Sequence, residues 1–506
     1  MKAIIYCTEE NRRELAGEVW RQFSCEDADF VGYADFPVKC DLLIVEHSLV
    51  NTLRGNEVSE SGRVFVSFNG RLYDVSMGEA YASERKRCVD KGRLAEAKDI
   101  NEALCDIDFI RKNTVNLSFP GFFQLETTDY CNSRCIMCEH YFTHNKNAER
   151  LSMETLECLR DAIQLSRRIN LNGMGEPFVS GLVKNQIDYY VSCGNRIVAN
   201  TNLSVLDDTL IELIGHHFEW LAISVDGARK QTYESIRKGL SFDVLMENLR
   251  RLKERVPHVK KIMSMVIMRQ NVCEMPELVK LAHDTGIDQV VFLNLNPNLI
   301  IDNLRDVMIR YPRTVEYYSV RALEAGKKYD VNVVVANAGN LNHNITLDDI
   351  QEELEEMRGF PMWKTRDEEE RMCETAGRVD TYLENHSQLQ TTTVPTDVRC
   401  SGVCDWLLTN CYTDLRGNVS MCCRNLAYRA GKVGRMGEFS EVWNAPLLRK
   451  CREIFYSGHV PEACLKCGMI EGGELKYLTV ETTPDFYRDT ELKIRQKKEL
   501  MALLGE

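Results

Sequence analysis

Between residue 118 and about residue 338 the sequence alternates short apolar runs with stretches of helical periodicity, and this rhythm limits the possible folds more than any other feature. Strands are expected at 122–125, 168–171, 195–202, 219–227, 261–268, 289–295 and 331–335, and helices at 153–166, 206–214, 242–256, 275–285 and 315–329. Roughly six strand–helix units in succession predict parallel strands joined by helical crossovers. In barrels built from such units, the functional site lies at the C-terminal ends of the strands.

Three cysteines follow the first of these strands at C-x₃-C-x₂-C spacing: Cys131, Cys135 and Cys138. A loop that wraps back on itself can aim three thiolates at one point. Three thiolates are one fewer than an ordinary iron–sulfur cluster uses, and one fewer than a closed structural zinc site needs. The open fourth position indicates a place where something else binds. Two plainer interpretations are a zinc site, which needs a fourth ligand and favours C-x₂-C pairs, and three cysteines of a core.

This cysteine spacing after a strand resembles the cluster loop of the radical S-adenosylmethionine (radical SAM) superfamily. The resemblance implies a [4Fe–4S] cluster held by Cys131, Cys135 and Cys138, whose fourth iron takes the amino and carboxylate groups of S-adenosyl-L-methionine (SAM). It also implies that an electron from the cluster breaks SAM into methionine and a 5′-deoxyadenosyl radical, which abstracts a substrate hydrogen. The implied fold is α/β, with a partial (β/α)6 radical SAM barrel as its core.

The loop after the second strand resembles the GGE motif of this family. It reads Gly173-Met174-Gly175-Glu176-Pro177, so Met174 replaces the first glycine of the usual pair. Glycines let a backbone approach a ligand closely. The resemblance therefore implies that Gly173, Gly175 and the Glu176 carboxylate meet the SAM amino group.

The resemblance assigns five further SAM contacts: Met137, Asn202, Ser224, Asp226 and Arg237. Asn202 ends a strand where the family often has Thr-Asn-Gly, but Leu203 stands in place of the glycine. Ser224 and Asp226 match a Ser-x-Asp-Gly motif, and Met137 occupies a position that usually contacts adenine through its backbone. Arg237 would donate charge-assisted hydrogen bonds to the SAM carboxylate, although a surface salt bridge is an equally good interpretation of this residue.

A second cysteine-rich region resembles the SPASM/twitch extension of radical SAM enzymes. Its expected ligands are Cys404, Cys422, Cys464 and Cys467, with Gly417 at the family position before Cys422. Four thiolates complete one auxiliary [4Fe–4S] cluster, which would accept or relay an electron. No cysteine follows Cys467, so the single-cluster twitch form is the better match. A zinc ribbon would use the same four ligands, and Cys411 or Cys423 could replace one of them.

Length and charge limit the remaining possibilities. A chain of 506 residues predicts about three domains, and a net charge of −13 argues against a nucleic-acid partner. No long apolar run or secretory signal is seen, so we expect a cytoplasmic protein without a membrane partner. Twenty cysteines in a reducing compartment indicate metal sites rather than disulfides.

The expected layout has five parts. Residues 1–112 form a small α/β domain, with a helix at 11–23, a hairpin at 63–68 and 71–75 around Asn69-Gly70, and a helix at 86–106. The radical SAM core barrel occupies 113–338, and 339–398 form a charged connector or lid with helices at 348–357 and 366–378. The SPASM/twitch domain occupies 399–475, and 476–506 form a helical tail.

The resemblance implies an oxidoreductase-type radical SAM enzyme that oxidises a small biosynthetic intermediate by dehydrogenation or cross-linking. Two alternatives are a SPASM maturase that modifies a peptide or protein, and a non-catalytic zinc-binding scaffold. A reductant such as flavodoxin or ferredoxin would be the electron-donating partner. The sequence assigns no catalytic acid or base.

Overall fold

The computed structural model describes residues 3–8, 11, 15, 28–31, 40, 42–52, 62–138, 140, 148–295, 306–335, 341–359, 363–364, 368, 393–399, 404–423, 429–434, 439–464, 470–471 and 474–475. The helices expected at 11–23 and 366–378, the tail at 476–506 and the predicted ligand Cys467 therefore lie wholly or mostly outside the described residues.

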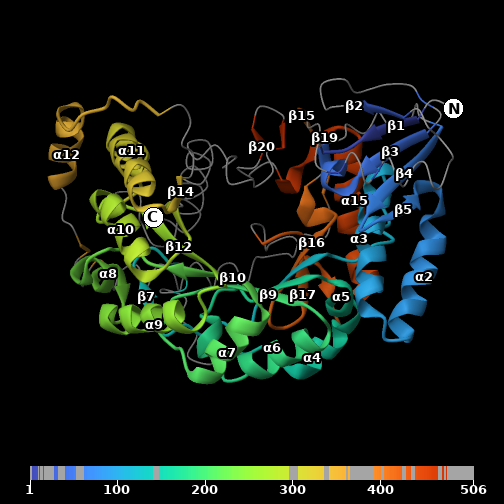
Figure 1. Cartoon of the computed structure of the whole chain (residues 1–506), viewed down its shortest axis with the longest axis horizontal. Coiled ribbons are helices and arrows are strands. Elements are labelled where there is room, and N and C mark those ends of the chain that lie inside the picture. Colours follow the sequence, from blue (N-terminus) through green and yellow to red (C-terminus); the bar gives the residue numbers. More distant parts are fainter. Residues whose placement is uncertain are drawn as a thin grey trace, which may run out of the picture.

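A parallel sheet forms the core of the molecule (Figure 1). Its described strands are β6 Phe122–Leu125, β8 Arg168–Asn170, β9 Arg196–Thr201, β10 Phe218–Ser224, β12 Lys260–Ile267, β13 Gln289–Asn294 and β14 Asn332–Val335. They are hydrogen-bonded in the order β14-β13-β12-β10-β9-β8-β6, so each strand except the last in sequence pairs with its successor. Within the described residues the sheet stays open, as the expectation of a partial barrel required.

Helical crossovers connect these strands on the outside of the curved sheet (Figure 1). They are α4 Met153–Cys158 with α5 Arg160–Leu165, α6 Val183–Ser192, α7 Asp208–His217, α8 Lys230–Ile236 with α9 Phe242–Arg255, α10 Met275–Thr285 and α11 Pro312–Tyr329. Ser152, Asp207 and Ser241 each accept a backbone N–H with the side chain at a helix start, which fixes where three of the helices begin.

Two expectations for the crossovers need correction. The single helix predicted at 153–166 is divided at Leu159, whose φ of −102° and ψ of 3° leave the helical region. Helices α6 and α8 were not predicted, although α6 buries Val183, Ile187 and Tyr190 at helical spacing.

The C-terminal region continues the same sheet. Strand β16 Asn410–Thr413 pairs in parallel with β6, and β17 Asn418–Ser420 and β18 Arg429–Lys432 follow in antiparallel order. Helices α14 Phe439–Trp443 and α15 Pro446–Tyr456 pack on this extension. Strand β15 Pro395–Arg399 pairs with β19 His459–Pro461, so β15 crosses the predicted boundary between connector and C-terminal domain.

The N-terminal unit is a separate sheet in the order β2-β1-β3-β4-β5. Its strands are β1 Ala3–Tyr6, β2 Ala28–Val31, β3 Leu42–Glu46, β4 Arg63–Phe68 and β5 Arg71–Asp74, and the 3₁₀ helix η2 His47–Thr52 follows β3. The predicted β4–β5 hairpin is confirmed, with Asn69 and Gly70 at φ of 47° and 71°. The helix predicted at 86–106 is two helices, α2 Gly78–Asp90 and α3 Leu94–Ile110, because Gly92 at φ 69° ends the first.

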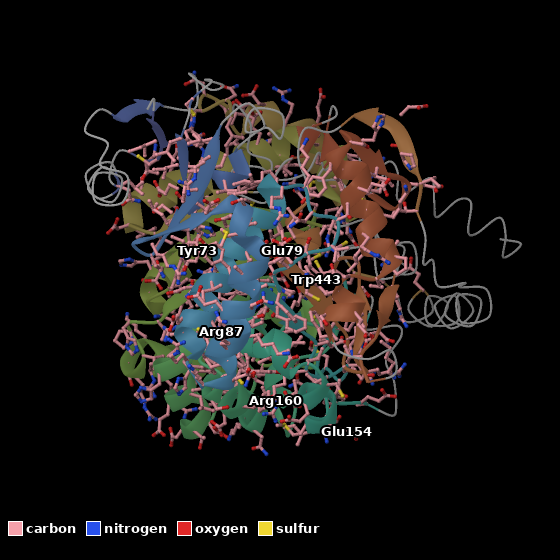
Figure 2. The ribbon with its side chains drawn as sticks, turned by 90° about the vertical axis from the view of Figure 1, so that its right-hand side faces the viewer. Tyr73, Glu79, Arg87, Glu154, Arg160 and Trp443 are labelled. Carbon is pink, nitrogen blue, oxygen red and sulfur yellow. The ribbon has the colours of Figure 1, made fainter. Side chains whose placement is uncertain are left out.

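The N-terminal unit and the C-terminal region lie against each other and against the barrel (Figure 2, where Glu79 marks α2 and Trp443 marks α14). One continuous apolar cluster includes Val45 of the N-terminal unit, Phe123 of the barrel and Trp443 of the C-terminal region. Arg452, buried on α15, donates to the carbonyls of Thr114, Leu407 and Trp443. The three regions therefore share a core instead of meeting at polar surfaces.

The described part of the connector folds back toward the barrel. Its helix α12 Gln351–Arg358 accepts a hydrogen bond from Arg269 Nη1 at the Met357 carbonyl. Trp363 packs against a small apolar cluster that also contacts Ile136 and Met137 of the cysteine loop, residues 131–138.

In the described residues we find no helix with the length and apolarity needed to cross a bilayer.

Candidate active site

The cysteine loop leaves the C-terminal end of β6, the edge at which the sequence placed it. Ser133 lies between two of its thiols, with Oγ 3.2 Å from Cys131 Sγ and 3.3 Å from Cys135 Sγ. The Cys138 N–H donates to the Cys135 carbonyl and closes a tight turn. Burial raises the pKa of Cys138 to about 12, so metal binding here must displace a thiol proton.

A short antiparallel pair ties this loop to the residue predicted to bind the SAM carboxylate. Strand β7 Arg134–Cys135 pairs with β11 Arg237–Lys238, with Cys135 opposite Arg237. Arg237 Nη1 lies 3.7 Å from Cys135 Sγ, and Nη2 forms a buried ion pair with Asp226 Oδ2 at 2.7 Å. Burial lowers the pKa of Arg237, but the Asp226 carboxylate more than offsets this, so the net direction is upward.

Asp226 is fully buried and is held in place from a second strand. Its Oδ1 accepts the Val266 N–H at 2.7 Å, and its carbonyl accepts Asn271 Nδ2. Arg237 is therefore not on the surface, and its partner is a buried carboxylate on the neighbouring strand end. The interpretation of Arg237 as a surface salt bridge on a helix is wrong.

The GxGEP loop docks directly on the backbone that leads into the cysteine loop. The N–H groups of Gly175 and Glu176 donate to the carbonyls of Thr128 and Tyr130. A Cβ at Gly175 would lie 2.4 Å from the Thr128 oxygen and 2.5 Å from the Tyr130 oxygen, so only glycine fits. Gly173 is packed as closely on the side chain of Glu126.

Glu176 joins this loop to the end of β9. Its Oε1 accepts Thr201 Oγ1 at 2.6 Å and the Phe178 N–H at 3.2 Å, and its Oε2 accepts the Asn202 N–H at 2.7 Å. Burial raises its pKa, and these hydrogen bonds oppose the rise. An ionised carboxylate offers about four acceptor positions, so about one remains for a further donor.

Asn202 reaches back to the cysteine loop, because its Nδ2 donates to Asn132 Oδ1 at 3.0 Å. Leu203, which stands where the family often has glycine, has a φ of 53°. This left-handed backbone costs a residue with a Cβ roughly 1–2 kcal/mol. Leu203 is completely buried, which contributes about 2 kcal/mol in return.

Ser224 and Met137 are the two remaining predicted SAM contacts. Ser224 is half-buried at the end of β10, and Met137 packs on the apolar cluster beneath the cysteine loop. The structure thus gathers Cys131, Cys135, Cys138, Gly173, Gly175, Glu176, Asn202, Asp226 and Arg237 at neighbouring strand ends. Sequence reasoning missed Ser133 and Thr201, although Ser133 lies inside the cysteine motif itself.

The described thiols do not surround a single ion. In the part of the chain that the structure describes, no three Cys, His, Asp or Glu side chains are arranged to hold one metal ion. In a [4Fe–4S] cluster each cysteine binds a different iron, so the thiols stand farther apart than around one zinc. Arg237 Nε is buried without a hydrogen-bond partner among the described residues, which leaves a donor for an anionic group such as the SAM carboxylate.

Cys404, Cys422 and Cys464 of the second region are half-buried and pack against the main apolar core. Gly417 turns the chain between β16 and β17 with a φ of 81°. Cys411 lies on β16 and is 1% exposed, and burial raises its pKa. The auxiliary ligand set stays a prediction, because Cys467 lies outside the described residues.

Residues 125–282 match the model of the radical SAM superfamily. The chain carries a radical SAM domain. Proteins of this family bind a [4Fe–4S] cluster and SAM, and these are the cofactors of the domain. The matched residues include the cysteine loop, the GxGEP loop and Arg237.

Two curated proteins show the extent of the sequence likeness. The chain is 27% identical to GTP 3′,8-cyclase of Agrobacterium fabrum (strain C58) over 179 residues, which are 34% of this chain and 50% of that protein. It is 26% identical to mycofactocin maturase MftC of Mycolicibacterium smegmatis over 175 residues, 34% of this chain and 43% of that protein. The chain thus spans about half the length of the curated relatives it matches.

Among solved structures, Streptococcus suis SuiB bound to S-adenosylmethionine aligns with 76% of this chain and 85% of its own. The sequence identity is 14% and the TM-score is 0.48.

Proposed function

We propose that this protein is a radical SAM enzyme that cleaves SAM reductively and abstracts a hydrogen atom from its substrate. The observation that carries the proposal is the cysteine loop of the radical SAM domain. The Ser133 hydroxyl lies within hydrogen-bonding distance of two of its thiols, and the GxGEP loop is hydrogen-bonded to the backbone that precedes it. A [4Fe–4S] cluster with SAM bound to it supplies a 5′-deoxyadenosyl radical for such chemistry.

The residues of the site divide the remaining work among them. Cys131, Cys135 and Cys138 hold the cluster, and the free acceptor position of Glu176 takes the ammonium group of SAM. The unpartnered Nε of Arg237 donates to the SAM carboxylate, while Asp226 keeps the guanidinium in place and charged.

The proposed reaction is a two-electron oxidation of a small biosynthetic intermediate, by dehydrogenation or cross-linking. One hydrogen atom leaves the substrate to form 5′-deoxyadenosine, and a proton and an electron follow. An auxiliary cluster on Cys404, Cys422, Cys464 and Cys467 would accept that electron, and a flavodoxin or ferredoxin would supply the electron that cleaves SAM.

The shape of the N-terminal unit supports a small substrate. A peptide-modifying maturase often carries a winged-helix module at its N-terminus. Here the described residues before 112 form a five-stranded sheet whose strands β2, β1, β3 and β4 are all parallel. Modification of a peptide is the second candidate, which the match to mycofactocin maturase MftC favours.

SAM cleavage under strict anaerobiosis tests the proposal. Reconstituted protein with dithionite and SAM should form 5′-deoxyadenosine and methionine, measured by liquid chromatography. Cys135→Ala should abolish this formation, whereas Cys273→Ala, an exposed cysteine outside the predicted ligands, should leave it unchanged. Absence of 5′-deoxyadenosine from cluster-loaded wild-type protein would contradict the proposal.

A further inference from the structure

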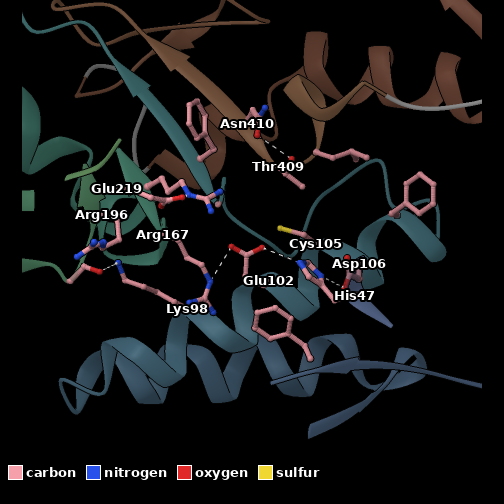
Figure 3. Close-up of a pocket in the computed structure, with 17 residues that line it drawn as sticks. His47, Lys98, Glu102, Cys105, Asp106, Arg167, Arg196, Glu219, Thr409 and Asn410 are labelled. Atoms are coloured by element: carbon pink, nitrogen blue, oxygen red, sulfur yellow. Dashed lines mark hydrogen bonds and ion pairs between the residues drawn. The ribbon is translucent and has the colours of Figure 1, made fainter. Parts of the chain in front are cut away.

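A cavity of about 530 Å³ lies between the N-terminal unit and the barrel (Figure 3). Its volume is within the range of small-molecule sites. All three regions of the protein line it: His47, Phe68, Lys98 and Glu102 come from the N-terminal unit, Arg168 and Arg196 from the barrel, and Thr409 and Asn410 from the C-terminal region.

The floor of the cavity is one row of residues across the core sheet. Asn410, Phe122, Arg168 and Arg196 are the first residues of β16, β6, β8 and β9, and each is paired in register with the next. The cysteine loop follows the last residue of β6. The cavity is therefore at the opposite end of the strands from the radical site and is distinct from it.

Helix α3 covers this floor with one face. Lys98, Glu102 and Asp106 are four residues apart and point into the cavity from the same side of the helix (Figure 3). His47 Nδ1 lies 2.6 Å from Asp106 Oδ2, and Arg167 Nε lies 3.4 Å from Glu102 Oε1. Arg168 likewise pairs with Glu219 at 2.7 Å. Most of the charges that line the cavity therefore lie beside an opposite charge.

Two cations are not matched in this way. Among the described residues neither Lys98 nor Arg196 forms an ion pair with a carboxylate. Lys98 is 3% exposed, and its Nζ donates to the carbonyls of Ser166 and Gly194, which leaves a third N–H. Arg196 makes one long contact, 3.5 Å from Nη1 to the His216 carbonyl.

The carbonyls that Lys98 contacts are close to the C-terminal ends of α5 and α6, where helix dipoles favour a cation. They carry partial charges only, so they do not replace a counter-ion for a buried ammonium group. Burial lowers the pKa of Lys98 to about 8, as expected for a cation that lacks an anionic partner. Arg196, on the floor of the same cavity, adds a planar guanidinium that suits an oxyanion.

We propose that this cavity binds a small molecule with a phosphate or carboxylate group, which Lys98 and Arg196 hold. The aromatic rings of Phe68 and Phe122 provide an apolar wall for the rest of the ligand. Because three regions line the cavity, the ligand strengthens the attachment of the N-terminal unit to the barrel. The inference does not depend on the radical chemistry proposed above.

Calorimetric titration of the full cluster-loaded chain with inorganic pyrophosphate and, separately, with citrate tests this site. We expect saturable binding of at least one anion at physiological ionic strength, with pyrophosphate identifying phosphate and citrate identifying carboxylate as the recognised group. Arg196→Gln should weaken the binding at least tenfold, which is about 1.4 kcal/mol. Lys98→Met should weaken the anion binding more than Arg196→Gln does.

Arg250→Gln is the matched control, since Arg250 is exposed on α9 and pairs with Glu247 and Glu254. Arg196 is also exposed, so Arg196→Gln should fold even if Lys98→Met does not. Lack of saturable binding of both anions to the wild-type protein would overturn the proposal. Equal affinities of Arg196→Gln and Arg250→Gln would also overturn it.

Discussion

At the scale of single residues, Gly175 shows how closely the cofactor loops are packed. A methyl group there would lie 2.4–2.5 Å from two backbone oxygens that cannot move independently of the cysteine loop. Gly175→Ala should therefore destabilise the protein by about 2 kcal/mol and reduce the iron retained. Gly181→Ala is the control, because no atom lies within 4 Å of a Cβ built at that residue. Similar denaturation midpoints and iron contents for the two variants would show that the close packing is not real.

The pair His47–Asp106 predicts a pH dependence of stability. Burial lowers the pKa of His47, but Asp106 more than offsets this and the net direction is upward, while burial raises the pKa of Asp106 to about 6. Both folded-state pKa values exceed the unfolded ones, so the folded state binds more protons. The contribution of these two raised pKa values to the free energy of unfolding is fully present at low pH, and it is lost as the pH rises through the folded-state pKa values.

His47→Gln should accordingly reduce stability more at pH 6 than at pH 8.5, by up to about 1 kcal/mol. Denaturation midpoints of wild type and variant at the two pH values measure the difference. His343→Gln, at an exposed histidine, should show no such difference. A loss from His47→Gln that is equal at both pH values, or larger at pH 8.5, would contradict the assigned ion pair.

The sequence predicted which residues lie together at the site better than it predicted the hydrogen bonds and ion pairs that join them. The cysteine spacing and the GxGEP loop identified the positions, because both motifs are local. The bonds from Glu176 to Thr201 and from Arg237 to Asp226 join residues 25 and 11 positions apart, and they depend on the order of the strands. The left-handed backbone of Leu203 was also beyond prediction, since leucine rarely adopts it.

At the scale of elements, α15 is fixed by one buried arginine. Arg452 donates to three carbonyls and to Asn444 Oδ1, and together these contacts join the C-terminal region to the segment that enters the barrel. Arg452→Met should cost about 3 kcal/mol or more, because it leaves buried acceptors unsatisfied. Arg449→Met, on the exposed face of the same helix, should cost less than about 0.5 kcal/mol. Equal denaturation midpoints for the Arg452→Met and Arg449→Met variants would contradict this role of Arg452.

Element types were predicted well where apolar periodicity was strong, as for the strands of the core sheet. Helix limits were predicted less well, because a helical pattern can continue across a local break. Leu159 divides one predicted helix although its side chain is buried, and Gly92 divides another through its backbone. Helix α6 was missed because its apolar residues are interrupted by polar ones on the exposed side.

At the scale of the whole molecule, the main finding is that the C-terminal region extends the barrel sheet. The pairing of β16 with β6 joins residues almost 290 positions apart, and no local pattern predicts such a partner. The same pairing places the second cysteine-rich region on the core that supports the first. A cluster there would be held by the same rigid sheet as the radical site.

Metal content tests the central claim, that Cys131, Cys135 and Cys138 hold an iron–sulfur cluster. Iron, sulfide and zinc are measured in anaerobically reconstituted wild type, in Cys131→Ala/Cys135→Ala/Cys138→Ala and in the control Cys158→Ala/Cys273→Ala. Two four-iron clusters predict about eight irons per chain in the wild type and the control, and about four in the triple variant. Iron that is unchanged in the triple variant, or zinc in place of iron in the wild type, would contradict the account.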